Sequence, residues 1–216
     1  EGGVRSMTQL LRFHFHFSRK SISILLVLAV LIFMIYSNAM VTQTIDVGLY
    51  TMSNLLMIYV PTLSIAHMLS GQFSVLMRIV PISPRLFVKS SYLYTLMLFS
   101  IIFIPLISMT SYQYFKGNIS SFPLCYMLGI FAFTLFATGG ALKAHFKQPT
   151  NKKSFSSIDL FFYYLLIFIS HVLLCLFFSI IHLTYLGAII TPIACFYLFY
   201  RQYLDAIKLY EQAEFI

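Results

Sequence analysis

The chain has 216 residues, of which 60% are hydrophobic and only 9% are charged, and its mean hydropathy is +0.88. Soluble domains carry about 25% charged residues, so this composition excludes a water-soluble fold and indicates an integral membrane protein. The formal net charge of +8 is explained by membrane topology, without nucleic-acid binding. Residues 1–6 precede a Met and are expected to be a cloning remnant outside the fold.

The first patterned segment is residues 8–20, TQLLRFHFHFSRK. Leu10, Phe13 and Phe17 recur at helical spacing, and Arg12 falls largely on the other side, as in a helix lying in the membrane interface. The alternating Phe and His residues also fit a strand, but an isolated strand would leave its edges unpaired. We expect an amphipathic elbow helix that sets the angle of the first span; a basic stop signal that merely anchors the terminus is the open alternative.

Six apolar stretches follow, each about as long as a membrane-spanning helix. They cover residues 21–40, 49–69, 92–109, 122–142, 158–178 and 182–200. The last two require a tight hairpin near residues 179–182, because an unbroken helix over 158–200 would be about 65 Å long, roughly twice the hydrocarbon thickness. The predicted fold is an all-α integral membrane protein, with residues 7–216 forming a single six-helix transmembrane domain. The run after residue 200 is expected to extend the sixth helix beyond the membrane.

The basic residues are distributed very unevenly among the connecting segments. Of the 14 Lys and Arg residues, all but Lys116 precede the first stretch, join the second to the third or the fourth to the fifth, or follow the sixth. Because basic residues accumulate on the cytoplasmic side, this count predicts a multi-pass plasma-membrane protein with both termini in the cytoplasm. Contact with anionic membrane lipids follows from the same charges.

The loop after the second stretch, residues 78–93, has the sequence RIVPISPRLFVKSSYL. Ser83 followed by Pro84 is typical of a helix N-cap and first-turn proline, so a short helix is predicted to begin at Pro84 and run toward the third stretch. Arg85 and Lys89 would lie one turn apart on one face. Several apolar side chains indicate either docking onto a partner or insertion into the membrane interface; they are Val80, Ile82, Leu86 and Phe87.

This segment resembles the small six-span permeases of bacterial ABC-2 type transporters, in which the ATPase is a separate chain. The matching residues are Val80, Pro81, Ile82, Ser83, Arg85, Val88, Tyr92 and Leu93. The resemblance implies that the segment is a cytoplasmic coupling helix that inserts into a groove of the ATPase subunit. In that role Arg85 and Lys89 would supply electrostatic contacts, and Ile82, Pro84 and Phe87 would be the apolar anchors. Many members carry small re-entrant helices between spans five and six, for which this chain has hardly any loop.

The resemblance also implies that ATP and Mg²⁺ are bound by the ATPase partner and that a second permease chain, identical or different, completes the pathway. The chain itself has no Gly-x-x-x-x-Gly-Lys-(Ser/Thr) loop, so it is expected to be neither an enzyme nor a cofactor-binding protein. No metal site or proton relay is predicted either, since His67, His171 and His182 lack carboxylates at helical spacing. The cysteines read as buried hydrophobes; they are Cys125, Cys175 and Cys195.

The 23 Phe and 15 Tyr residues suggest the substrate class. An aromatic, uncharged pathway suits amphipathic or lipid-like cargo better than ions, although the same residues can simply face lipid. Staphylococcal exporters of amphipathic phenol-soluble modulin peptides belong to this permease type, and the chain looks like such a subunit. The expected function is ATP-driven export of amphipathic peptides. Two alternatives stay open: a membrane sensor or peptide-immunity protein that transports nothing, and an ion-coupled transporter, for which no half-to-half repeat or intramembrane acid is visible.

Overall fold

A computed structural model of the chain describes residues 7–19, 82–117, 121–147 and 157–214, together with seven single positions between 22 and 34. All regular structure in these residues is helical, as predicted, and they contain no strand. The predicted stretch 49–69 and most of 21–40 lie outside the described residues. The helices are α1 (Met7–Phe17), α5 (Pro84–Phe115), α6 (Ser121–Lys147), α7 (Ser157–Ile180) and α8 (Thr184–Glu214).

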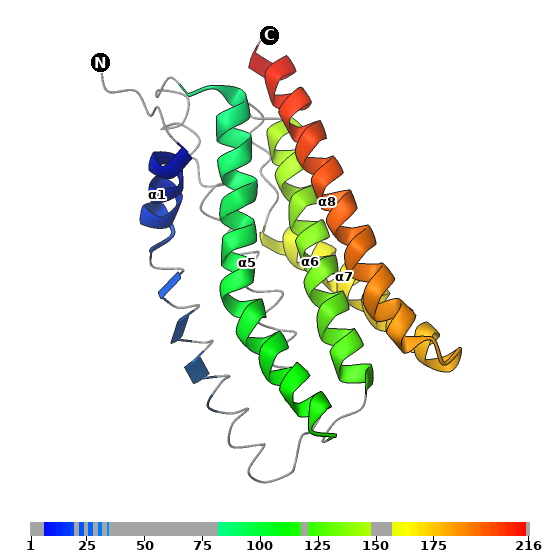
Figure 1. Ribbon diagram of the computed structural model, residues 1–216. Helices are drawn as coiled ribbons and strands as arrows, with labels where there is room; N and C mark the ends of the chain where they lie inside the picture. The colour runs from blue at the N-terminus through cyan, green and yellow to red at the C-terminus, as the bar shows by residue number, and fades with distance from the viewer. Residues whose placement is uncertain are drawn as a thin grey trace.

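Helix α6 is the centre of the bundle and packs against α5, α7 and α8, with its largest contact along α8 (Figure 1). α5 and α6 run in opposite directions, and α1 lies beside the first turns of α5 (Figure 1). The start of α5 and the ends of α6 and α8 therefore meet at one end of the bundle. We call it the basic end, because the side chains of Arg85, Lys89, Lys143 and Lys208 come from these three segments.

Helix α5 begins at the predicted residue. Ser83 has extended backbone, its hydroxyl accepts a hydrogen bond from the Leu86 N–H at 3.4 Å, and Pro84 occupies the first turn. A proline is tolerated there because the N–H it lacks would have no partner within the helix. The helix then continues to Phe115 without interruption. The predicted short coupling helix is thus not a separate element, but the first turns of a 32-residue helix.

Helices α7 and α8 are joined by the predicted tight hairpin. The amide of Leu183 donates to the carbonyl of Phe178 at 2.9 Å, and the amide of His182 donates to that of Ser179 at 3.1 Å. This pair of bonds is a Schellman ending, which needs a residue with positive φ between the helices. His182 fills that position with φ 55°. The chain therefore reverses within three residues, 181–183.

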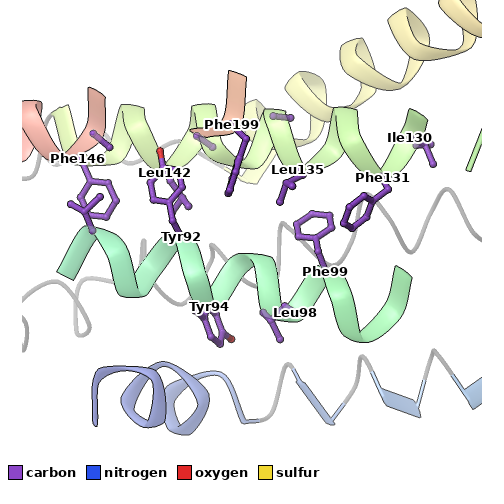
Figure 2. Packing of buried hydrophobic residues seen from close by; sticks show 14 of the residues in the cluster. Tyr92, Tyr94, Leu98, Phe99, Ile130, Phe131, Leu135, Leu142, Phe146 and Phe199 are labelled. Carbon is purple, nitrogen blue, oxygen red and sulfur yellow. The ribbon is translucent and has the colours of Figure 1, made fainter. Parts of the chain in front are cut away.

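The core between the helices is strongly aromatic (Figure 2). Phe131 of α6 stacks on Phe103 of α5 at 3.7 Å between ring centroids and meets Phe99 edge-on at 5.7 Å. Further along α5, the hydroxyl of Tyr92 donates to the carbonyl of Gly139 at 2.9 Å. A Cβ at Gly139 would lie 2.6 Å from the Phe199 ring, so the missing side chain lets α8 approach α6 closely.

Two helices in the described residues, Pro84–Phe115 and Tyr126–Phe146, are long and apolar enough to cross a membrane by their length and composition. The outer faces of α7 and α8 also carry large apolar side chains with high exposure, such as Leu166 at 65% and Ile193 at 65%. Soluble proteins rarely expose extended apolar faces of this kind. These features agree with the membrane protein that the composition predicts.

The predicted elbow helix is present as α1. Of its predicted apolar residues, Leu10 is fully buried against the bundle and Phe17 is 36% exposed. The other buried side chains on this helix face are His14 and Ser18, which with Leu10 form a stripe at every fourth position. Phe13 is half-buried and stacks on Phe17 at 6.3 Å, while Arg12 is exposed as predicted.

Candidate coupling surface

The first turns of α5 present part of the predicted coupling segment at the surface of the basic end. Ser83, Arg85 and Lys89 are exposed, and Ile82 and Pro84 are half-buried. Arg85 and Lys89 lie one turn apart, as predicted. The two remaining residues of the predicted segment, Val80 and Pro81, lie outside the described residues.

Phe87 is the exception, and its predicted role as an anchor for a partner is wrong in this structure. Its side chain is only 7% exposed and lies within the chain's own core. The ring meets Phe146 of α6 edge-on at 5.6 Å and lies 5.6 Å from the ring of Tyr210 of α8. Phe87 therefore joins the three helices that meet at the basic end. A partner protein cannot bury a side chain that its own chain already covers.

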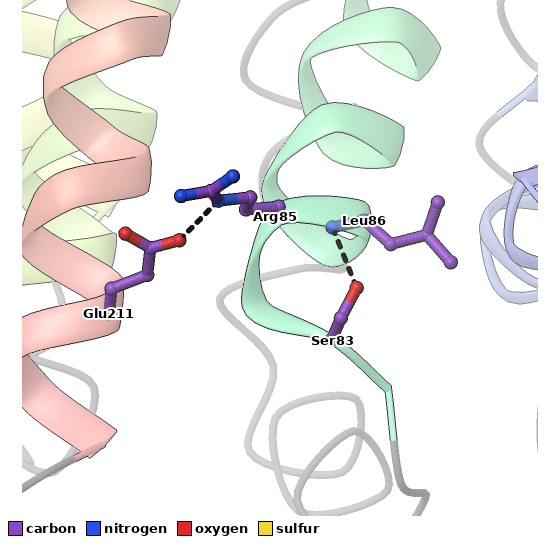
Figure 3. Close-up of polar contacts among 4 residues, drawn as sticks. All are labelled: Ser83, Arg85, Leu86 and Glu211. Atoms are coloured by element: carbon purple, nitrogen blue, oxygen red, sulfur yellow. Dashed lines mark hydrogen bonds and ion pairs between the residues drawn. The ribbon is translucent and has the colours of Figure 1, made fainter.

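Arg85 is held by the C-terminal part of α8. Its Nε lies 2.6 Å from Oε1 of Glu211, which is 126 residues away in the sequence (Figure 3). The Arg85 side chain is 76% exposed and that of Glu211 is 31% exposed, so water weakens the attraction between them. The pair still fixes where the guanidinium points, toward α8 and across the space between the two helices (Figure 3).

An open groove of about 580 Å³ lies between the start of α5 and the end of α8. Half-buried side chains of α8 supply its apolar surface, namely Tyr203, Leu204 and Ile207. Its charged side chains are Arg85, Lys89, Lys208 and Glu211. Three cations against one carboxylate make this groove a positive surface with an apolar floor.

A second ion pair ties α8 to α6. Nζ of Lys143 lies 2.6 Å from Oδ2 of Asp205, and both side chains are partly exposed. The hydrogen bond from Lys143 is the main reason that the pKa of Asp205 is lowered from its ordinary value, and the nearby charges of Arg201 and Lys208 lower it further. The carboxylate thus stays ionised at neutral pH, and the end of α8 is fastened to both neighbours.

Helix α1 is joined to α5 by a buried polar cluster. Nε2 of His14 lies 3.1 Å from the Ser90 hydroxyl, and the imidazole stacks on the Tyr94 ring with 5.0 Å between centroids. The Tyr94 hydroxyl donates to the Ser18 hydroxyl, which in turn donates to the His14 carbonyl at 2.6 Å. Because buried polar groups are costly without partners, this network fixes α1 against the part of α5 that follows the predicted coupling segment.

Three residues at this surface, Asp205, Lys208 and Glu211, were not predicted from the sequence to belong to the site. One signal was available, because the chain has only 6 Asp and Glu residues against 14 Lys and Arg. Three of those acids, Asp205, Glu211 and Glu214, lie on the part of the last helix that follows the final apolar stretch, where basic residues also gather. An acid is therefore a natural partner for the coupling segment, but helical spacing alone could not show which one reaches it.

Within the described residues, no group of three or more His, Cys, Asp or Glu side chains could hold a metal ion. His171 is buried and its Nε2 lies 3.1 Å from the Tyr126 carbonyl, so it contacts the bundle itself. Comparison of the chain with protein-family models, with curated proteins and with solved structures finds no match.

Proposed function

We propose that this chain is the membrane subunit of an ATP-driven exporter and that a separate ABC ATPase docks on the exposed start of α5. The observation that carries the proposal is the coupling surface itself. Ser83, Pro84 and Arg85 form an exposed helix start, capped as the resemblance to ABC-2 type permeases requires, at the end of the bundle where the basic residues gather. ATP and Mg²⁺ belong to the ATPase in this arrangement.

The packing of the helices provides a route by which movement of the ATPase reaches the rest of the bundle. Because α5 runs from Pro84 to Phe115, a push at its first turn is carried along the helix that packs on α6 as far as Pro105, where the helix lacks one backbone hydrogen bond. Phe87 and the two ion pairs carry the same displacement to α6 and α8. ATP binding to the ATPase then shifts the population between two packings of the bundle, since packed cores change in discrete steps.

The proposed topology has six spans with both termini in the cytoplasm of a bacterium. It rests on the placement of basic residues in the sequence, where Lys116 alone falls on the other side. The coupling surface then faces the compartment that contains ATP. A second permease chain, identical or different, completes the pathway, and the aromatic composition favours an amphipathic peptide as the exported substrate.

The test is purification of the tagged chain from its native membrane in mild detergent, with mass spectrometry of the proteins that come with it. Arg85→Glu alone would also place two carboxylates together, because Glu211 is 2.6 Å away. The informative variant is therefore the exchange Arg85→Glu with Glu211→Arg, which keeps the internal pair and reverses its direction. A matched exchange, Lys143→Asp with Asp205→Lys, reverses the other ion pair, which joins α6 to α8 and does not involve α5.

The expected result is a P-loop ATPase that co-purifies with the wild-type chain and with the Lys143/Asp205 exchange, and is lost with the Arg85/Glu211 exchange. Absence of any P-loop ATPase, even after crosslinking, would contradict the proposal and favour a sensor or peptide-immunity protein. Retention of the ATPase by the Arg85/Glu211 exchange would show that Arg85 is not part of the docking surface.

A further inference from the structure

We propose that the groove between α5 and α8 binds an anionic phospholipid, with the phosphate group between Lys89 and Lys208 and an acyl chain along the outer face of α8. The groove includes Ser83 and Arg85 of the helix start where the ATPase is proposed to dock, and Lys89 lines it one turn further along α5. This inference goes beyond the proposed function, and it stands whether or not the chain transports anything. It rests on the shape, charge and position of the groove.

The charges of the groove leave two cations for a ligand. Arg85 is already bound to Glu211 at 2.6 Å. Lys89 of α5 and Lys208 of α8 are exposed side chains that line the same groove from its two helices. Two ammonium groups on opposite sides of a groove attract a phosphate diester, and basic pockets between helices at a membrane surface recognise anionic headgroups in this way.

The apolar floor distinguishes a lipid from a free anion. Tyr203, Leu204 and Ile207 are only half-buried, so a small ion in the groove would leave their apolar surface in water. An amphiphile covers the floor with its apolar part while the lysines hold its charge. At about 580 Å³, the groove has room for a headgroup and the start of its acyl chains, but not for a whole lipid.

The rest of the acyl chain has a surface to follow. Leu204 and Lys208 belong to a stripe of α8 that repeats every three or four residues, and its earlier members are Ile193, Tyr197 and Tyr200. These three side chains are 65%, 58% and 56% exposed, so the stripe faces outward until it enters the groove. From Ile193 to Lys208 the helix rises about 22 Å, comparable to the length of an acyl chain. Tyrosines between an apolar face and a charged rim are typical of the membrane interface.

The alternative occupant is an acidic segment of a partner protein. The outward-facing apolar stripe favours the lipid, because it leads from the groove along the face of α8 that would contact the bilayer. A lipid is also present in the membrane at a high local concentration, so a site of modest affinity is filled.

The experiment measures lipid retention by the full chain in detergent micelles, using native mass spectrometry during titration with phosphatidylglycerol or phosphatidylcholine. The test variant is Lys89→Gln with Lys208→Gln. The matched control, Arg12→Gln with Lys116→Gln, removes the same charge at two exposed positions outside the groove. A third variant, Leu204→Gln, changes the floor and keeps both lysines. Inorganic phosphate is titrated as a competitor that has the phosphate of the headgroup but no acyl chains.

We expect the wild-type chain and the control to retain phosphatidylglycerol in preference to phosphatidylcholine. Near a membrane each lysine contributes about 1 kcal/mol, so the lysine pair variant should bind about 30-fold more weakly. Leu204→Gln should weaken lipid binding as well, and inorganic phosphate should not compete.

Equal losses in the control and the test variant would overturn the proposal, since attraction to net charge would then suffice. Competition by inorganic phosphate would overturn it in favour of a free-anion site. Binding unchanged in the test variant, or displacement of lipid by an acidic peptide of a co-purified protein, would also overturn it.

Discussion

Replacing Gly129 by Ala tests the contact between α6 and α7, where the His171 ring of α7 packs directly over this glycine. A Cβ at this position would lie 2.2 Å from Cε1 of His171 and within 3.2 Å of both ring nitrogens. Carbon atoms in contact are normally about 3.5–4.0 Å apart, so the overlap exceeds 1 Å. His171 has little freedom to move away, because its Nε2 contacts the Tyr126 carbonyl at 3.1 Å and its ring centroid lies 5.1 Å from that of Tyr126 and 5.2 Å from that of Phe133.

Two opposing effects set the size of the change. Ala is favoured over Gly within a helix by about 1 kcal/mol. Overpacking a well-filled site costs about 1–3 kcal/mol, and an overlap with a confined ring belongs at the upper end. We therefore expect Gly129→Ala to destabilise the chain by about 1–2 kcal/mol, or about 2–8 °C in melting temperature.

The assay is thermal unfolding in detergent, followed with a dye that reacts with thiols as they become exposed, since Cys195 is buried in the folded chain. The double variant Gly129→Ala with His171→Ala removes the ring that the new methyl group meets. It should be more stable than the sum of the two single changes predicts. A neutral or stabilising effect of Gly129→Ala, or strict additivity in the double variant, would show that α7 does not pack on Gly129 in this way.

Three further variants test other contacts. Phe87→Ala should lower the free energy of unfolding by about 3–5 kcal/mol in the isolated chain, because it empties a buried aromatic site; an unchanged melting temperature would contradict the burial of this ring. Asp205→Asn should lower the melting temperature at pH 7. Because the folded-state pKa is lowered, the difference from wild type should begin to shrink as the pH falls below the ordinary Asp pKa of 3.8 and vanish only below the lowered pKa. A difference that does not shrink at low pH would contradict the pair with Lys143. Ser18→Ala should cost about 1–3 kcal/mol by removing a buried partner of the Tyr94 hydroxyl, and proteolysis within residues 7–19 measures the release of α1; cleavage at the wild-type rate would argue against the network.

Local sequence signals predicted the elements well wherever a short-range physical rule applies. The Ser83–Pro84 pair placed the start of α5 because capping depends only on neighbouring residues. Length against membrane thickness required the hairpin between α7 and α8, and the structure has it at residues 181–183. The continuation of α8 beyond residue 200 was predicted from the helical spacing of apolar residues in that run.

Contacts between distant segments could not be predicted in the same way. Helical spacing identified an apolar side of α1 suited to the membrane interface, but it could not show that His14 is buried against α5, where Ser90 and Tyr94 contact its ring. Phe87 looked like an anchor for a partner because an apolar residue in a basic loop has no visible cover in the sequence. Its cover, Phe146 and Tyr210, comes from two other helices. Six spans and their orientation stay predictions from charge placement, beyond the two helices whose length and composition suit a membrane.

ATP hydrolysis and transport measured together, in vesicles that contain the chain with its co-purified ATPase, test whether the start of α5 couples the two. The substrate is a fluorescent amphipathic helical peptide, and the variant is Arg85→Glu with Glu211→Arg, reconstituted with an excess of the ATPase. We expect ATP-dependent peptide movement in wild-type vesicles, and its loss in the variant while the ATPase still hydrolyses ATP. Peptide transport by the variant at the wild-type rate would contradict the assignment of the coupling surface. If the wild-type chain moves no amphipathic peptide in an ATP-dependent way, the proposal that it is an exporter is contradicted.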